Sequence, residues 1–168
     1  MTKDFKEIKY IKCEDYINLN LDMMYAGDSN TLNNLDYDLE SIINTEAPIT
    51  YNILKERLRE CFNIKKISGK ALDVILEHLK KFGYAETDNL YDKTIWADGV
   101  KDINFIRVGY QRQIYDIPRE EISNVMLKYI DEGYIGDDLY HMILKYFSYE
   151  VLTEKAREYL NFVFKKLK

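Results

Sequence analysis

The sequence predicts a mainly α-helical protein of the α+β class, and three observations carry this prediction. Apolar residues recur at helical spacing in several separate segments, two short strand patterns flank an Asp-Asn pair, and Gly and Pro are scarce, at 7 and 2 of 168 residues. Apolar residues make up 46% and charged residues 32% of the chain, which excludes collagen-like and disordered compositions. A chain of this length can bury a core without a metal or a disulfide.

The first 34 residues are expected to be a partly irregular N-terminal extension. Residues 7–12 alternate weakly and predict a short strand, and residues 26–34, rich in turn formers, predict a loop. The first fifty residues hold 4 basic and 10 acidic side chains, whereas residues 51–168 hold 20 and 19. The net charge of −5 is therefore a property of the N-terminal segment, and it does not exclude a basic patch elsewhere.

Three helices are expected between residues 35 and 83. The first begins near Leu35 and ends before Pro48. The second follows an N-cap at Thr50, and the third follows an N-cap at Ser68 and ends at Gly83.

Residues 84–97 contain two short strand patterns on either side of an Asp-Asn turn. Three helices followed by a hairpin is the order of a winged helix, in which the second and third helices form a helix-turn-helix and the hairpin is the wing. The sequence therefore predicts a first winged-helix-like unit over residues 35–100.

A second copy of this helical unit is expected over residues 118–168. At an offset of 85 residues, seven apolar positions from Leu54 onward coincide without a gap with apolar positions from Leu139 onward. Pro118 lies near the start of this copy, and residues 101–117 are expected to be the linker before it, with a strand pattern at residues 104–108. The second copy leaves no room for a wing, so it is expected to be truncated.

Catalytic motifs are missing from the sequence. Gly69-Lys70 lacks the upstream glycine of a phosphate-binding loop, and no Cys or His cluster has metal-ligand spacing. We therefore expect no enzyme activity, cofactor or metal for this chain. Glu86, Asp88 and Lys93 offer a nuclease-like alternative, although acidic residues beside a turn are usually solvated.

The sequence predicts a cytoplasmic protein without a membrane partner. Cys13 and Cys61 are expected to be reduced thiols, the N-terminus is too charged for a signal peptide, and no apolar run is long enough to span a membrane.

Local basic segments indicate where nucleic acid would bind. Residues 51–81 hold 8 basic and 4 acidic side chains, and residues 145–168 hold 6 and 3. In both segments the cations lie near an expected helix start, where free N–H groups and the helix dipole favour a phosphate. The predicted nucleic-acid-binding residues are Lys65, Lys66, Ser68, Lys70, Lys155 and Arg157. The alternative is that these side chains are only solvated helix faces. The wing and its flank, residues 86–102, hold 2 basic and 5 acidic side chains and would repel phosphate.

Five short motifs, in this order, resemble those of a known family. They are Glu46-Ala47-Pro48-Ile49, Cys61-Phe62-Asn63-Ile64-Lys65-Lys66, Ser68-Gly69-Lys70-Ala71, Ile117-Pro118-Arg119-Glu120-Glu121-Ile122 and Leu152-Thr153-Glu154-Lys155-Ala156-Arg157-Glu158. The third is similar to a Gly-Ser-Arg-Ile helix start in that family, and the fourth to an Ile-Pro-Pro-Glu-Glu-Ile segment. The family is the C-terminal domain of large bacterial superfamily-one DNA/RNA helicase-like proteins, downstream of helicase and restriction-endonuclease-like domains.

The resemblance implies a non-catalytic accessory module of a nucleic-acid motor, whose parent protein would be the helicase and ATPase. Two departures bear on this role. Lysine stands at positions 70 and 155 where the family has arginine, which implies a weaker grip on phosphate, and Glu154 replaces a small polar residue.

Two functions therefore stand as expectations. The first is a module that binds nucleic acid, DNA more than RNA, through the helix-turn-helix segments. The alternative is a protein-interaction module that docks onto the helicase or nuclease domains of the parent protein, which the acidic N-terminal segment and the acidic wing favour.

Overall fold

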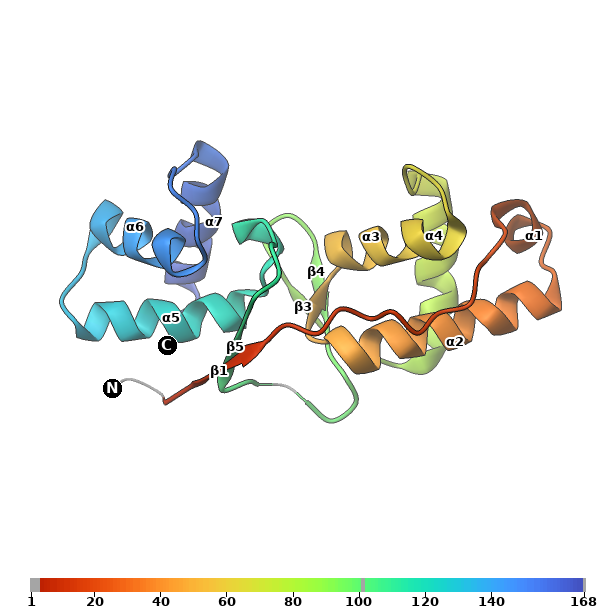
Figure 1. Ribbon diagram of the computed structural model, residues 1–168, viewed down its shortest axis with the longest axis horizontal. Coiled ribbons are helices and arrows are strands. Elements are labelled where there is room, and N and C mark those ends of the chain that lie inside the picture. Colours follow the sequence, from red (N-terminus) through yellow and green to blue (C-terminus); the bar gives the residue numbers. More distant parts are fainter. Residues whose placement is uncertain (1–3, 101, 168) are drawn as a thin grey trace. The chain divides into compact units, whose positions relative to one another are not determined.

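The computed structural model describes residues 4–100 and 102–167, and the chain divides into two compact units (Figure 1). Residues 11–87 and 92–99 form one of them, which we call the α1–α4 unit. Residues 4–10, 88–91 and the described residues from 100 onward form the other, the α5–α7 unit. Helices dominate both units and the sheets are small, so the expected mainly α, α+β class is confirmed. Residues 1–3, 101 and 168 of the predicted segments lie outside the described residues.

The α1–α4 unit combines a group of helices with a small sheet. Its helices are α1 (Leu21–Tyr25), α2 (Ser29–Glu46), α3 (Tyr51–Phe62) and α4 (Gly69–Leu79), and a 3-10 turn (Lys80–Phe82) follows α4. Strands β2 (Ile49–Thr50), β4 (Lys93–Ile95) and β3 (Glu86–Asp88) lie side by side in that order. β2 is antiparallel to β4, with Ile49 opposite Ile95. The hairpin expected within residues 84–97 is thus present.

The start of α2 corrects the sequence prediction, because the segment expected to be a loop over residues 26–34 is helical from Ser29 onward. Asp28 caps this helix: its Oδ2 accepts hydrogen bonds from the Thr31 backbone N–H at 2.9 Å and from the Thr31 hydroxyl at 2.8 Å. The weak helix propensity of Ser and Asn misled the prediction, since a good N-cap and burial of the following helix face outweigh propensity.

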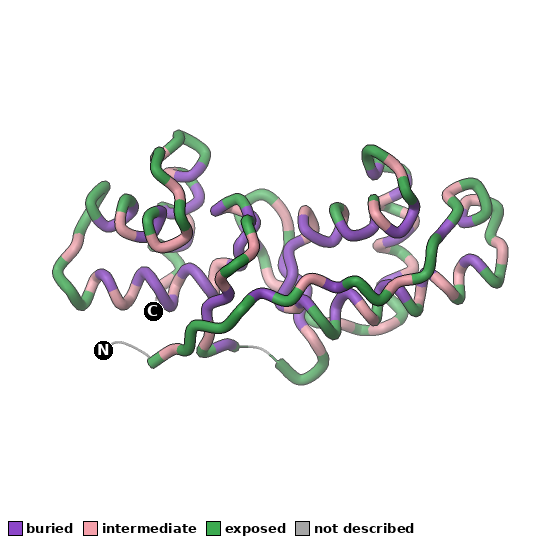
Figure 2. Tube along the Cα trace, in the orientation of Figure 1, coloured by how far each residue is buried: buried purple, intermediate pink, exposed green. Residues whose placement is uncertain are grey.

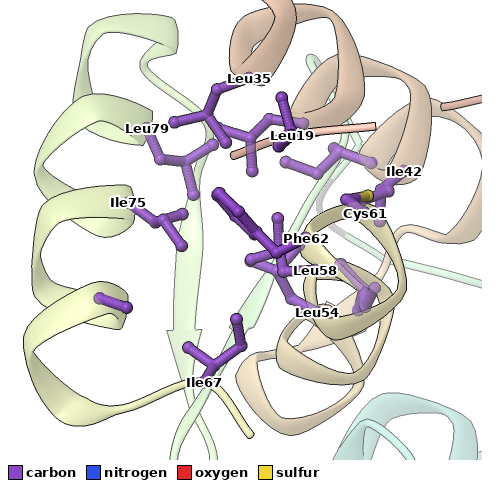
Figure 3. Packing of buried hydrophobic residues seen from close by; sticks show 14 of the residues in the cluster. Leu19, Leu35, Ile42, Leu54, Leu58, Cys61, Phe62, Ile67, Ile75 and Leu79 are labelled. Carbon is purple, nitrogen blue, oxygen red and sulfur yellow. The ribbon is translucent and has the colours of Figure 1, made fainter. Parts of the chain in front are cut away.

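The core of the α1–α4 unit lies between α2, α3 and α4. Leu35 and Leu39 of α2 are fully buried, as are Leu58 of α3 and Ile75 of α4. Figure 3 shows Phe62 of α3 pointing toward the α4 side of this cluster. Leu19, like Cys13 and Met24, belongs to the same core, so residues 11–34 of the expected extension contribute to the core of this unit.

One buried ion pair stabilises the end of α2. Arg57 donates from Nε to Oε2 of Glu46 at 2.7 Å and from the guanidinium Nη2 to Oε1 at 2.8 Å. The Cys13 backbone N–H donates to the same carboxylate at 3.2 Å. Because one carboxylate balances one guanidinium with several hydrogen bonds, this pair can lie in the core without a free charge.

The α5–α7 unit combines three helices with two parallel strands. The helices are α5 (Arg119–Asp131), α6 (Gly136–Tyr146) and α7 (Glu154–Lys165), the strands are β1 (Lys6–Lys9) and β5 (Phe105–Val108), and a 3-10 turn spans Ile114–Asp116. β1 and β5 run side by side, with Lys6 opposite Phe105 and Lys9 opposite Val108.

Residues 102–117, expected to be a linker, belong to the core of the α5–α7 unit. Ile106, Ile114 and Ile117 are buried in one cluster with Ile122 and Leu160. The segment contains no helix long enough to show a period, which is why the sequence suggested a linker, but its apolar side chains fill the space beside α5 and α7. Among the described residues, no helix combines the length and the apolar character that crossing a membrane requires.

Candidate nucleic-acid interface

The start of α4 is built by the cap that the sequence predicted. The Ser68 side-chain oxygen accepts a hydrogen bond from the Ala71 backbone N–H at 3.1 Å, and the Ser68 carbonyl accepts one from the Leu72 N–H at 2.9 Å. Since its oxygen already caps the helix, Ser68 can offer a ligand only its hydroxyl proton. Gly69 and Lys70 follow in the first turn, where backbone N–H groups have no partner inside a helix.

The turn before α4 presents two lysines on an anchored backbone. Asn63 adopts a left-handed conformation after α3, and the Ile64 N–H bonds back to the Arg59 carbonyl at 3.1 Å. Ile67 is buried in the core and fixes the end of the turn. Lys65 and Lys66 between these anchors are exposed, as is most of the turn in Figure 2.

The three lysines of this region keep their charge available. Lys70 is exposed, and its Nζ lies 4.6 Å from the ring centroid of Tyr25 in α1, a cation–π contact that positions the ammonium group without neutralising it. Neither Lys65, Lys66 nor Lys70 forms an ion pair with another described residue. We call Lys65, Lys66 and Lys70 the α4 lysines. The structure thus brings together four of the six predicted residues, the α4 lysines and Ser68.

The other two predicted residues lie at the start of α7, and both are engaged within the α5–α7 unit. Lys155 Nζ lies 3.8 Å from the ring centroid of Tyr115 and 4.9 Å from that of Tyr91. Arg157 forms an ion pair with Asp137, and its Nε lies 4.0 Å from Glu154. The prediction treated the two helix starts alike, but the guanidinium of Arg157 is already matched by two carboxylates.

Two acidic residues of the hairpin accept hydrogen bonds from the first turn of α3. Asp92 Oδ2 accepts a hydrogen bond from the Asn52 backbone N–H at 3.0 Å, in the first turn of α3, and the Tyr51 hydroxyl donates to Glu86 at 2.5 Å. Thr50 stands at the N-cap position as predicted, but its side chain makes no capping bond, and Asp92 supplies the acceptor instead. Burial and the nearby Glu86 carboxylate raise the pKa of the Tyr51 hydroxyl. Asp92 thus caps α3, and the acidic side chains of the hairpin leave it unsuited to follow a phosphate backbone.

The tip of the hairpin, residues 88–91, belongs to the α5–α7 unit. Asn89 is buried there, where its Oδ1 accepts a hydrogen bond from the Tyr159 hydroxyl at 2.8 Å. The Tyr91 hydroxyl donates to Glu158 at 2.9 Å. Protein contacts thus occupy the tip that a wing would offer to a ligand.

Of the groups considered for catalysis, Glu86 and Lys93 lie together on the hairpin. Glu86 accepts the Tyr51 hydrogen bond and lies 3.9 Å from Lys93 Nζ, and His78 Nε2 lies beside the Asp36 carboxylate. In the part of the chain that the structure describes, no three His, Cys, Asp or Glu side chains are grouped as metal ligands. Both cysteines are buried free thiols, and burial raises the pKa of Cys13 and of Cys61.

Sequence reasoning missed a buried cluster in the α5–α7 unit, in which Arg107 and Arg112 share the carboxylate of Glu121. An arginine within the otherwise apolar strand Phe105–Val108 was the signal that could have indicated it, because a charge in a buried strand needs a partner.

Comparison with known proteins found no match among family models, curated proteins or solved structures. The resemblance to the helicase-associated domain therefore stays a hypothesis that depends on the quoted motifs.

Proposed function

We propose that the α1–α4 unit is a winged-helix-like module that binds nucleic acid, DNA in preference to RNA, through the α3–α4 turn and the start of α4. The observation that carries this proposal is the set of three unpaired, exposed α4 lysines around the free N–H groups of a capped helix start. The role is non-catalytic. It would be exercised in the cytoplasm, as an accessory module of a helicase-like protein.

The order and pairing of the elements support the winged-helix part of the proposal. A helix (α2), a short strand (β2), two helices (α3 and α4) and a hairpin (β3 and β4) follow one another, and β2 pairs with the second strand of the hairpin. In this arrangement α3 and α4 correspond to a helix-turn-helix, and α4 to its recognition helix. We propose the α5–α7 unit as a related helical unit without a wing.

Charge and geometry define the expected mode of binding. Lysine ammonium groups contact phosphates as point charges, so the α4 lysines would hold the backbone without reading sequence. If they release counterions from three phosphates, the affinity falls about 40-fold between 50 and 200 mM salt. The acidic hairpin would not add contacts, so the binding is expected to be weak and strongly salt-dependent.

A fluorescence-anisotropy titration tests the proposal, with a labelled 20-base-pair DNA duplex, the single strand and the equivalent RNA duplex at 50 and 200 mM NaCl. We expect salt-dependent binding that the triple variant Lys65→Ala/Lys66→Ala/Lys70→Ala weakens at least about tenfold. The matched control Lys145→Ala/Lys165→Ala/Lys166→Ala removes the same charge from exposed positions of the α5–α7 unit. Equal loss in both variants, or no binding at 50 mM NaCl, contradicts the proposal.

A second candidate function, docking onto helicase or nuclease domains, is favoured by the segment between β1 and α1. Ile11 is 66% and Ile17 39% exposed, beside the exposed acidic side chain of Glu14. Such side chains would bury apolar surface against a partner whose basic residues meet the carboxylates of this segment. This alternative predicts no DNA affinity and a complex with a helicase core that Ile11→Asp dissociates.

A further inference from the structure

A pocket of about 320 Å³ opens in the α5–α7 unit beside the turn that follows β5. Its volume is at the lower end of the range for small-molecule sites. The turn supplies Tyr110, Gln111 and Arg112, β5 supplies Arg107, and the end of α6 supplies Tyr146 and Phe147. The hydrogen-bond donors and the aromatic rings of this lining indicate what the pocket could hold.

The pocket lies against two buried guanidinium groups. Arg107 donates from Nε to Glu121 Oε1 at 2.7 Å, and Arg112 donates from Nη2 to Glu121 Oε2 at 2.8 Å. Arg107 and Arg112 are 6% and 4% exposed, and Glu121 is fully buried. Two guanidinium groups contact the carboxylate of Glu121 here.

One donor of this cluster has no partner. The Arg112 Nε is buried and makes no hydrogen bond with any described residue, although the two Nη atoms bond to Glu121 and to the Arg107 carbonyl. The ring of Tyr10 covers both guanidinium groups, at 4.7 Å from Arg112 and 4.8 Å from Arg107. A buried cation with an unused donor is stabilised by an additional anion, because desolvation without a partner costs free energy.

The aromatic walls define the body of the ligand. Tyr110 stacks on Tyr10 with ring centroids 5.0 Å apart, and the rings of Tyr146 and Phe147 meet edge to face at 5.3 Å. The Tyr146 hydroxyl donates to Glu7 at 2.5 Å, so it is occupied and leaves the polar contacts of the ligand to the arginines and Gln111. An inorganic anion alone would leave the apolar walls in contact with water.

We propose that this pocket binds a small organic oxyanion, a phosphate or carboxylate group carried on a flat ring. The oxyanion contacts the Arg107–Arg112 side of the pocket, and the ring packs against Tyr110 and Phe147. This site is independent of the proposed nucleic-acid interface, which lies in the α1–α4 unit, so either can fail without the other.

The test is a titration of the ¹⁵N-labelled full chain, followed by NMR at the arginine Nε–H signals. The probes are dAMP, benzoate and, as the uncharged control, deoxyadenosine. We expect saturable shifts of the Arg112 Nε–H signal with dAMP or benzoate and none with deoxyadenosine. The anion that binds more tightly distinguishes phosphate from carboxylate chemistry. Equal shifts with deoxyadenosine, or no saturable shift with either anion, would overturn the proposal.

Variants of exposed residues near the pocket test anion binding without changing the buried core. Gln111 is exposed, so Gln111→Glu adds a negative charge there and is expected to weaken anion binding about fivefold at low salt. Gln113→Glu makes the same change two residues away, at an exposed position outside the pocket lining, and serves as the matched control. Arg112→Met leaves Arg107 and Glu121 as a balanced pair and should fold while losing anion binding. Equal effects of the two glutamine variants, or anion binding retained by Arg112→Met, would overturn the proposal.

Discussion

The helix starts of α4 and α7 have the same backbone but different surroundings. Ser68 and Thr153 occupy equivalent positions at the offset of 85, and each accepts a capping hydrogen bond at 3.1 Å. Lys70 pairs with no described carboxylate, whereas Arg157 beside the second start is paired with Asp137. The two helix starts therefore share their caps but not the availability of charge, and phosphate binding depends on that availability.

The buried carboxylates of the two units also differ in the charged groups around them. Glu46 pairs with Arg57, and Glu121 pairs with Arg107 and Arg112. Asp38 in the α1–α4 unit accepts a hydrogen bond from the Ile17 N–H at 2.5 Å and forms no ion pair with another described residue. Burial would raise the pKa of Glu121, but Arg112 and Arg107 hold it below its ordinary value. Burial raises the pKa of Asp38 to about 6. The pKa of Glu121 is lowered by its neighbouring arginines, whereas that of Asp38 is raised by burial. The two groups therefore change the stability in opposite directions as the pH rises.

The largest effect is expected from Glu121→Gln, which leaves Arg107 and Arg112 buried without a carboxylate. We expect a loss of unfolding free energy of roughly 3–5 kcal/mol, and a smaller loss from Glu46→Gln, which strands one arginine. Urea denaturation measures both. Glu132→Gln, at an exposed pair with Lys128, is the control and should change stability little. A smaller loss for Glu121→Gln than for Glu46→Gln would refute the comparison of charge balance.

The next effect concerns pH and Asp38. Its folded pKa is about 6 and its unfolded value about 3.8, so the folded state binds the proton more tightly. Its contribution to stability is therefore full below about pH 4 and is lost as the pH rises to 6. Asp38→Asn should remove this decline and raise the unfolding free energy at pH 7.5 by roughly 1–3 kcal/mol. Urea denaturation from pH 4 to 7.5 measures it, and an unchanged pH profile in the variant would exclude Asp38 as the cause.

A smaller effect distinguishes the two helix starts. At 50 mM NaCl, Lys70→Ala should weaken DNA binding several-fold, because one unpaired phosphate contact is lost. Lys155→Ala should change the affinity less than twofold, roughly, because the carboxylates of Asp137 and Glu154 lie at the same helix start and repel phosphate. Anisotropy titrations of both variants check this, and a larger effect of Lys155→Ala would place the interface on the α5–α7 unit.

The smallest effect is expected from the caps. Ser68→Ala and Thr153→Ala each remove one N-cap hydrogen bond of equal length, so each should cost about 1 kcal/mol of stability. Thermal unfolding followed by circular dichroism measures both losses. Clearly unequal losses would show that the two starts differ in the backbone as well as in their surroundings.

The features that can be predicted from the sequence are those determined by residues close together in the chain. The Ser68 cap, the end at Gly83 and the hairpin strands each follow from residues that lie close together in the sequence. The early start of α2 was missed because one aspartate cap outweighed the turn-forming composition after it. The sequence predicts a linker before α5, because the burial of Ile106 and Ile114 depends on helices that lie elsewhere in the unit.

For the candidate sites, the sequence by itself determined which residues carry charge and which positions begin a helix. Only the tertiary structure decided which of those charges remain available. Lys70 and Lys155 stand at matching positions and each lies over tyrosine rings, but Asp137 from the start of α6 pairs with Arg157 beside Lys155. The physical reason is that helix capping acts over three or four residues, whereas ion pairing depends on which side chains the fold brings within a few ångströms.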